Sequence, residues 1–187
     1  MNDPHVCAVC AAAGPTCCVL APGQEEYCFP LSEIERHRIL ETGADTGFFA
    51  QSPNSAAFLD TLRTLFPGEE ERLAALFPAR GSHFRLATHP DGRCKLLGPQ
   101  GCTLPREARP YYCRLFPLWP ERSQVMVFGA NCCLARQEAR GLSALLRLLG
   151  ESQANLRHMF GRLRLAWGLA PKDGDALFKD ILNRKCS

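Results

Sequence analysis

At 187 residues, the chain is long enough to bury the core of one globular domain, and 46% hydrophobic with 22% charged residues is ordinary for a folded protein. No stretch approaches the run of about 20 apolar residues that a membrane span needs, so we expect no membrane contact. The formal net charge is +3, and residues 133–187 carry ten Lys and Arg against five Asp and Glu. This positive excess suits a solvated helix face or an acidic protein partner. Nucleic acid is not expected as a partner, because no aromatic residues are interleaved with these charges.

The first part of the chain is predicted to be a loop followed by helices. Residues 7–28 are rich in cysteine, alanine, glycine and proline without periodicity, which predicts a loop. Ser32 and Glu35 form a capping box that predicts the start of a helix, and Gly43 predicts its end. Apolar residues at helical spacing, closed by prolines, predict two further helices, over residues 54–66 and 69–77.

The rest of the chain is predicted to combine short strands with helices. Alternation and turn residues predict strands over residues 82–88, 93–97 and 125–128, with a turn at His89–Gly92. Prolines bracket one or two helical turns at 104–109. Apolar stripes predict helices over 133–149 and 152–167 and a last one capped by Asp173.

These elements predict a mostly α-helical α+β fold. We expect residues 1–132 to form a cysteine-rich metal-binding domain and residues 133–187 to form a helical segment packed as part of the same domain. The metal site is expected between the cysteine-rich N-terminal loop and the short central β-hairpin, with the C-terminal helices packed alongside.

The cysteine content is the one unusual feature of the composition. The chain has eleven cysteines, an odd number that cannot all pair within one molecule. Cys17–Cys18 and Cys132–Cys133 are adjacent pairs, and a disulfide between neighbouring residues would strain the peptide. Residues 1–10 lack the basic and apolar regions of a secretory signal. We therefore expect a cytoplasmic protein, in which cysteine clusters indicate metal or redox sites before disulfides.

The first cysteine group is Cys7-x2-Cys10-x6-Cys17-Cys18, and nine residues separate Cys18 from Cys28. A C-x2-C segment lets two thiolates reach one ion from a tight turn, and both Zn²⁺ and iron–sulfur clusters are held in this way. For Cys28, a buried small apolar residue is as good an interpretation as a metal ligand.

The second group is Cys94-x7-Cys102-x10-Cys113, and Cys132–Cys133 directly before the C-terminal helices form a third. Residues 96–101 read as a turn that brings Cys94 and Cys102 together. Arg109 and Arg114 flank Cys113, and guanidinium groups can offset the excess negative charge of bound thiolates and donate hydrogen bonds to sulfur. We expect these two arginines to support the cofactor in this way.

The predicted metal ligands are therefore cysteines of all three groups: Cys7, Cys10, Cys17, Cys18, Cys94, Cys102, Cys113, Cys132 and Cys133. A 4Fe–4S cluster or a structural Zn²⁺ needs four ligands, so this set allows two centres or one centre with spare cysteines. Dispersed ligands beside aromatic residues and arginines favour an iron–sulfur cluster slightly, since zinc sites more often use paired C-x2-C knuckles. Cys186, next to the last residue, is not expected to be a ligand.

These motifs resemble the zinc- or iron-chelating CxxCxxCC domain family (the YkgJ-like proteins). The resemblance covers roughly residues 7–120 and rests on four parts in order: the cluster Cys7 to Cys18, the segment Leu31-Ser32-Glu33-Ile34, the pair Cys94 and Cys102, and the run from Arg109 to Pro117. The gap between Cys10 and Cys17 is longer than in the compact family pattern. The resemblance implies metal chelation, with zinc and iron both open, and flagellin lysine methylases look like larger relatives.

Three classes of function remain open on the sequence alone. The first is a metal-binding module that is not itself a catalyst. The second is an iron–sulfur-dependent enzyme for protein methyl transfer or redox chemistry, although no dinucleotide fingerprint, P-loop or nucleophile elbow is present. The third is metal delivery or sensing, which exposed and exchangeable thiolates would favour.

Overall fold

The computed structural model describes residues 5–14, 16–21, 24, 28–121, 124–129 and 132–170. In these residues the fold is mostly helical with small antiparallel strand pairs, so the predicted α+β class is confirmed. The chain forms two compact units, each described by itself: unit 1 comprises residues 1–17 and 97–187, and unit 2 comprises residues 18–96. Unit 1 thus includes residues from both predicted parts, 1–132 and 133–187, and that predicted division remains a prediction.

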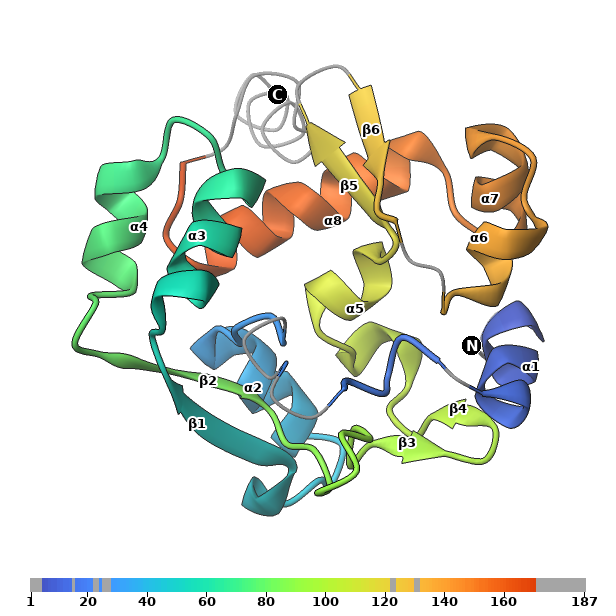
Figure 1. The fold of residues 1–187 in the computed structure, drawn as a ribbon, viewed down its shortest axis with the longest axis horizontal. Coiled ribbons are helices and arrows are strands. Elements are labelled where there is room, and N and C mark those ends of the chain that lie inside the picture. Colours follow the sequence, from blue (N-terminus) through green and yellow to red (C-terminus); the bar gives the residue numbers. More distant parts are fainter. Residues whose placement is uncertain are drawn as a thin grey trace, which may run out of the picture. The chain divides into compact units, whose positions relative to one another are not determined.

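In its described residues, unit 2 combines three α-helices and one short 3₁₀ helix with one pair of strands (Figure 1). Ser32 caps α2 (Glu33–Leu40) through the predicted capping box, in which the Glu35 carboxylate accepts from the Ser32 backbone N–H at 2.9 Å. The Ser55 side chain accepts from the N–H of Phe58 and starts the next helix. The remaining elements are η2 (Thr46–Phe48), β1 (Phe49–Pro53), α3 (Ala56–Leu65), α4 (Glu70–Leu76) and β2 (Ser82–Leu86).

The central hairpin predicted for unit 2 is partly formed. The strand predicted over 82–88 is present as β2, which pairs antiparallel with β1. Just beyond β2, Thr88 pairs antiparallel with Cys94, and the Lys95 N–H donates to the Ala87 carbonyl at 2.9 Å. Residues 92–94 also pair with the cysteine segment: the Leu20 N–H donates to the Gly92 carbonyl at 3.0 Å, and the Cys94 N–H donates to the Cys18 carbonyl at 2.8 Å. Gly92 has φ +81°, and a Cβ there would lie 1.7 Å from the Leu20 oxygen, so this close approach requires glycine.

His83 on β2 is a buried histidine in the core of unit 2. Its ring stacks on Phe58 with centroids 3.8 Å apart, and its Nδ1 lies 2.8 Å from Oδ1 of Asn54. Because the Asn54 amide nitrogen donates to the Pro78 carbonyl, its oxygen faces the ring and accepts the Nδ1 proton. Burial, aided by the positive charge of Arg85, lowers the pKa of His83 from 6.5 to about 4.

We expect this histidine to make the chain less stable in mild acid. Between about pH 6.5 and pH 4, His83 of the unfolded chain binds a proton that His83 of the folded chain excludes. The folded state therefore has its full free energy of unfolding above pH 6.5 and loses part of it as the pH falls. Denaturant unfolding should give a free energy about 2 kcal/mol lower at pH 5 than at pH 7, and His83→Gln should remove most of that difference. An equal pH dependence in both proteins would contradict the assignment.

Unit 1 is built around a long C-terminal helix, α8 (Gln153–Ala166), which begins at the Ser152 cap. Helix α5 (Tyr111–Leu115) and strand β5 (Leu118–Glu121) both pack against α8 (Figure 1). The fully buried Trp119 lies at the centre of this packing, edge-to-face on Phe160 with centroids 4.9 Å apart. The other elements are α1 (His5–Ala13), β3 (Leu97–Gly98), β4 (Gly101–Cys102), η3 (Arg106–Ala108), β6 (Gln124–Val127), α6 (Leu134–Glu138) and α7 (Leu142–Leu148).

Two expectations for unit 1 are wrong. Residues 5–13 form helix α1 where a loop was expected, since alanines favour a helix even without an apolar stripe. The single helix expected over 133–149 is divided into α6 and α7, because Gly141 has φ +91° and interrupts helical geometry. The helix expected from Asp173 lies outside the described residues.

No helix in the described ranges is both long enough and apolar enough to cross a membrane.

Candidate metal centre

Helix α1 presents two of the predicted ligands on one side. Cys7 and Cys10 are three residues apart, and residues at this spacing are neighbours on a helix surface. The helix packs against β4, which ends at Cys102, and against α6, which follows Cys133. Folding of unit 1 therefore brings the N-terminal C-x2-C pair next to elements that carry cysteines from the second and third groups.

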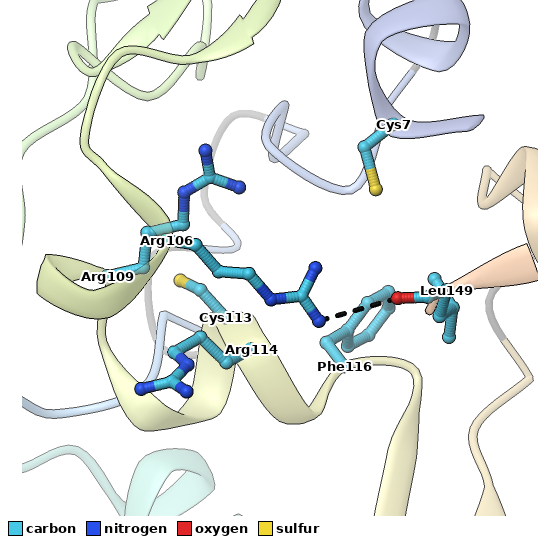
Figure 2. A pocket seen from close by; sticks show the side chains of 7 residues that line it. All are labelled: Cys7, Arg106, Arg109, Cys113, Arg114, Phe116 and Leu149. Atoms are coloured by element: carbon cyan, nitrogen blue, oxygen red, sulfur yellow. Dashed lines mark hydrogen bonds between the residues drawn. The ribbon is translucent and has the colours of Figure 1, made fainter. Parts of the chain in front are cut away.

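Cys7 and Cys113 line one small pocket of unit 1, with a volume of about 50 Å³ (Figure 2). Three arginines line the same pocket, Arg106, Arg109 and Arg114, together with Phe116 and Leu149. Cys7 is partly exposed and Cys113 is exposed. Two cysteines that are far apart in the sequence thus share one positively charged recess.

Arg109 holds the backbone of the second cysteine group. Its Nε and Nη2 donate to the Leu104 carbonyl at 3.0 and 2.9 Å, and Nη2 also donates to the Cys102 carbonyl at 3.2 Å. The guanidinium group therefore ties the end of β4 to the turn that precedes α5. Arg109 and Arg114 both lie at the Cys113 pocket, and their predicted role in compensating thiolate charge remains a prediction.

Arg106 is a pocket residue that the sequence analysis missed. Its Nη2 donates to the Leu149 carbonyl at 3.4 Å and forms an ion pair with the carboxylate of Glu151. The side chains of the pair are only 17% and 6% exposed. A signal was present in the sequence: Arg106 and Arg109 are three residues apart across a 3₁₀ turn, where side chains at this spacing lie above one another.

The charge of these arginines also acts on a neighbouring carboxyl group. A backbone hydrogen bond holds the pKa of the exposed Glu107 below its usual range, and the positive charges of Arg114 and Arg106 act in the same direction. Arg106 and Arg114 therefore favour the charged form of this carboxyl group.

Cys10, Cys132 and Cys133 form a second neighbourhood of thiols in unit 1. The sulfur of Cys10 lies 3.7 Å from the carbonyl oxygen of Cys132, although the two residues are 122 positions apart. Burial raises the pKa of the Cys133 thiol, and the neighbouring Cys10 and Cys132 raise it further, against two backbone hydrogen bonds that lower it. The Cys133 thiol therefore stays protonated more readily than an exposed thiol.

Three cysteines of the described chain, Cys18, Cys28 and Cys94, lie in unit 2. The backbones of Cys18 and Cys94 are hydrogen bonded at 2.8 Å, and both side chains are half-buried. The Cys28 sulfur lies 3.9 Å from the Leu86 carbonyl at the end of β2. Cys17, the last residue of unit 1, is exposed.

The predicted ligands therefore come together in small sets rather than in one preformed cage. Among the described residues, no three His, Cys, Asp or Glu side chains lie together in an arrangement that could hold a metal ion. Cys102 is placed by its pairing with Leu97 in the β3–β4 hairpin. Cys186 lies outside the described residues.

Comparison of the chain with protein-family models, with curated proteins and with solved structures finds no match.

Proposed function

We propose that the chain is a cysteine-ligated metal-binding protein. The observation that carries the proposal is the convergence of Cys7 and Cys113 on one pocket lined by three arginines. The approach of Cys10 to Cys132 supports it, because it brings the same N-terminal helix to the third cysteine group. Thiolates are ligands for zinc and for iron–sulfur clusters alike, and guanidinium groups can offset their negative charge.

The donor set fits an iron–sulfur cluster slightly better than zinc. The candidate cysteines come from several elements rather than from two C-x2-C knuckles. Tyr112 lies on α5, the helix that bears Cys113, and its ring centroid is 6.1 Å from those of Phe116 and Trp119. Ligation by Cys7 and Cys113 with further cysteines of unit 1 would form one centre. A second centre would use Cys18 and Cys94 of unit 2.

We infer the cellular setting and the family from the same residues. Cysteine thiolates bind metal in a reducing compartment, which favours the cytoplasm. The run from Arg109 to Pro117 and the resemblance to the zinc- or iron-chelating CxxCxxCC domain family support metal chelation. A catalytic role is not proposed, because no site in the described residues favours a particular reaction.

Alkylation of the thiols with and without a chelator tests the proposal residue by residue. In the protein as isolated, metal ligands should react slowly with iodoacetamide, and chelation should make them reactive, as read by mass spectrometry. Cys186, which is not a predicted ligand, serves as the control and should react equally in both samples. An unchanged labelling pattern for Cys7 and Cys113 would contradict the proposal.

A second candidate function is metal delivery or sensing. It is favoured by the exposure of Cys17 and Cys113, because exposed thiolates can pass a metal to a partner protein. Transfer to a competing chelator within minutes would support this function, whereas metal that withstands a strong chelator would argue for a structural or cluster site.

A further inference from the structure

Cys18 and Cys94 lie directly opposite each other in a short antiparallel ladder of unit 2. Val19 and Arg93 form an antiparallel bridge, and the register of such a ladder places the residue before Val19 opposite the residue after Arg93. The hydrogen bond from the Cys94 N–H to the Cys18 carbonyl, at 2.8 Å, agrees with this register. Two cysteines that are far apart in the sequence are therefore neighbours across one ladder.

The backbone of Cys94 is held from its other side as well. Thr88 pairs antiparallel with Cys94, and the Lys95 N–H donates to the Ala87 carbonyl at 2.9 Å. Cys94 thus has backbone neighbours on both sides, with Cys18 on one and Thr88 on the other. The position of Cys94 opposite Cys18 follows from the fold of unit 2 and not from the flexibility of a side chain.

The separation of directly opposed residues suits a disulfide bond. Opposed residues of an antiparallel pair have Cα atoms roughly 4.5–5.5 Å apart, and disulfides join Cα atoms about 4.4–6.8 Å apart. Because this pair is hydrogen bonded, its Cβ atoms start further apart than the ~3.8 Å that is average for a disulfide, so we expect the bond to form with some strain. Strained or exposed disulfides are easily reduced, and they are regulatory more often than structural.

Both side chains are thiols and are half-buried, so a small reagent can reach the sulfur atoms. One thiolate attacks a low-molecular-weight disulfide, forms a mixed disulfide with half of it and releases the other half as a thiol. The second thiolate then attacks the protein sulfur of the mixed disulfide and releases the second half. Two protein thiols are oxidised to one disulfide, the reagent is reduced to two thiols, and each protein thiol gives its proton to a leaving thiolate.

We propose that Cys18 and Cys94 form a redox-sensitive pair, which a low-molecular-weight disulfide of the glutathione class converts into a reversible cross-link. The cross-link joins the first residue of unit 2 to a strand near its end and closes a loop that contains nearly all of the unit. Closing a long loop restricts the unfolded chain and so stabilises the folded one. The inference goes beyond the proposed metal binding and does not depend on it, because it needs only the two thiols.

Addition of oxidised glutathione to the full chain tests the inference. The chain is purified under reducing conditions and divided into two samples, one of them treated with a chelator so that any bound metal is removed. Peptide mapping without reduction should find Cys18 joined to Cys94 in most molecules of the chelator-treated sample, and dithiothreitol should reverse the cross-link. Calorimetry should show a Tm that is higher by roughly 5–15 °C in the cross-linked chain.

Two serine variants provide the matched comparison. In Cys94→Ser the second thiol is missing, so Cys18 should retain glutathione as a mixed disulfide and the Tm should not rise. Cys28→Ser changes the same atoms at another half-buried cysteine of unit 2 and should behave like the wild type. A wild-type chain that lacks the cross-link in both samples, or that joins Cys94 to a different cysteine, would overturn the inference whether or not Cys94→Ser folds.

Metal content, measured on the same samples, separates this inference from the metal proposal. Cross-linking in a chain that takes up neither iron nor zinc on reconstitution would refute the metal centre alone. Bound metal in the untreated sample, with no cross-link after chelation, would refute the redox-sensitive pair alone.

Discussion

Replacement of Cys113 by serine is expected to lower the metal content of the purified protein by about half or more and to lower its Tm by roughly 5–10 °C. Cys113 lies in the pocket shared with Cys7 and the three arginines, and it ends the second cysteine group. A serine hydroxyl stays protonated near neutral pH and is a poor ligand for metals that prefer sulfur. Because metal binds the folded chain, loss of the metal also removes its contribution to stability.

The matched control for this variant is Cys186→Ser, which changes the same atoms at a cysteine outside the predicted ligand set. Metal content by mass spectrometry and Tm by calorimetry should be unchanged in the control. A Cys113→Ser protein with full metal stoichiometry and an unchanged Tm would exclude Cys113 as a ligand.

Trp119→Ala is expected to lower the free energy of unfolding by about 3–5 kcal/mol, more than the other packing variants described below. The Trp119 side chain is fully buried, packs edge-to-face on Phe160 of α8 and lies 6.1 Å from the ring of Tyr112 on α5. Truncation to alanine leaves a cavity in a close-packed core and removes the aromatic contacts. Because α5 carries Cys113, we also expect weaker metal retention in this variant.

Two companion variants separate packing from unspecific damage. Trp119→Phe keeps an aromatic ring and should lose less than Trp119→Ala, whereas Leu165→Ala on the exposed side of α8 should change the free energy by less than about 1 kcal/mol. Denaturant unfolding measures all three. A Trp119→Ala protein as stable as Leu165→Ala would contradict the place of Trp119 in the core.

Elements with local signals could be predicted from the sequence. The Ser32–Glu35 capping box starts α2 as expected, and prolines and glycines mark the ends of α3, α4 and α8 near the predicted positions. These signals succeed because caps, helical spacing and chain breakers act within a few residues. The predicted strand over 125–128 corresponds to β6, which extends from Gln124 to Val127.

Features that depend on distant residues could not be predicted. The partner of β2 is Phe49–Pro53, which has no clear strand signal and becomes a strand through its pairing. Strand β5 contains Pro120 and was missed because proline usually argues against a strand. The candidate site depends on the same kind of information. The cysteines can be recognised in the sequence, but the convergence of Cys7 with Cys113 and the position of Arg106 follow from the packing of distant residues.

The most direct test of the proposed metal binding is elemental analysis with an absorption spectrum of the full chain purified without oxygen. The proposal predicts metal bound through cysteine: iron, acid-labile sulfide and a broad absorption band at about 400 nm for an iron–sulfur cluster, or zinc in a colourless protein for the alternative metal. Purified protein with neither iron nor zinc, and with no metal taken up on reconstitution, would contradict it.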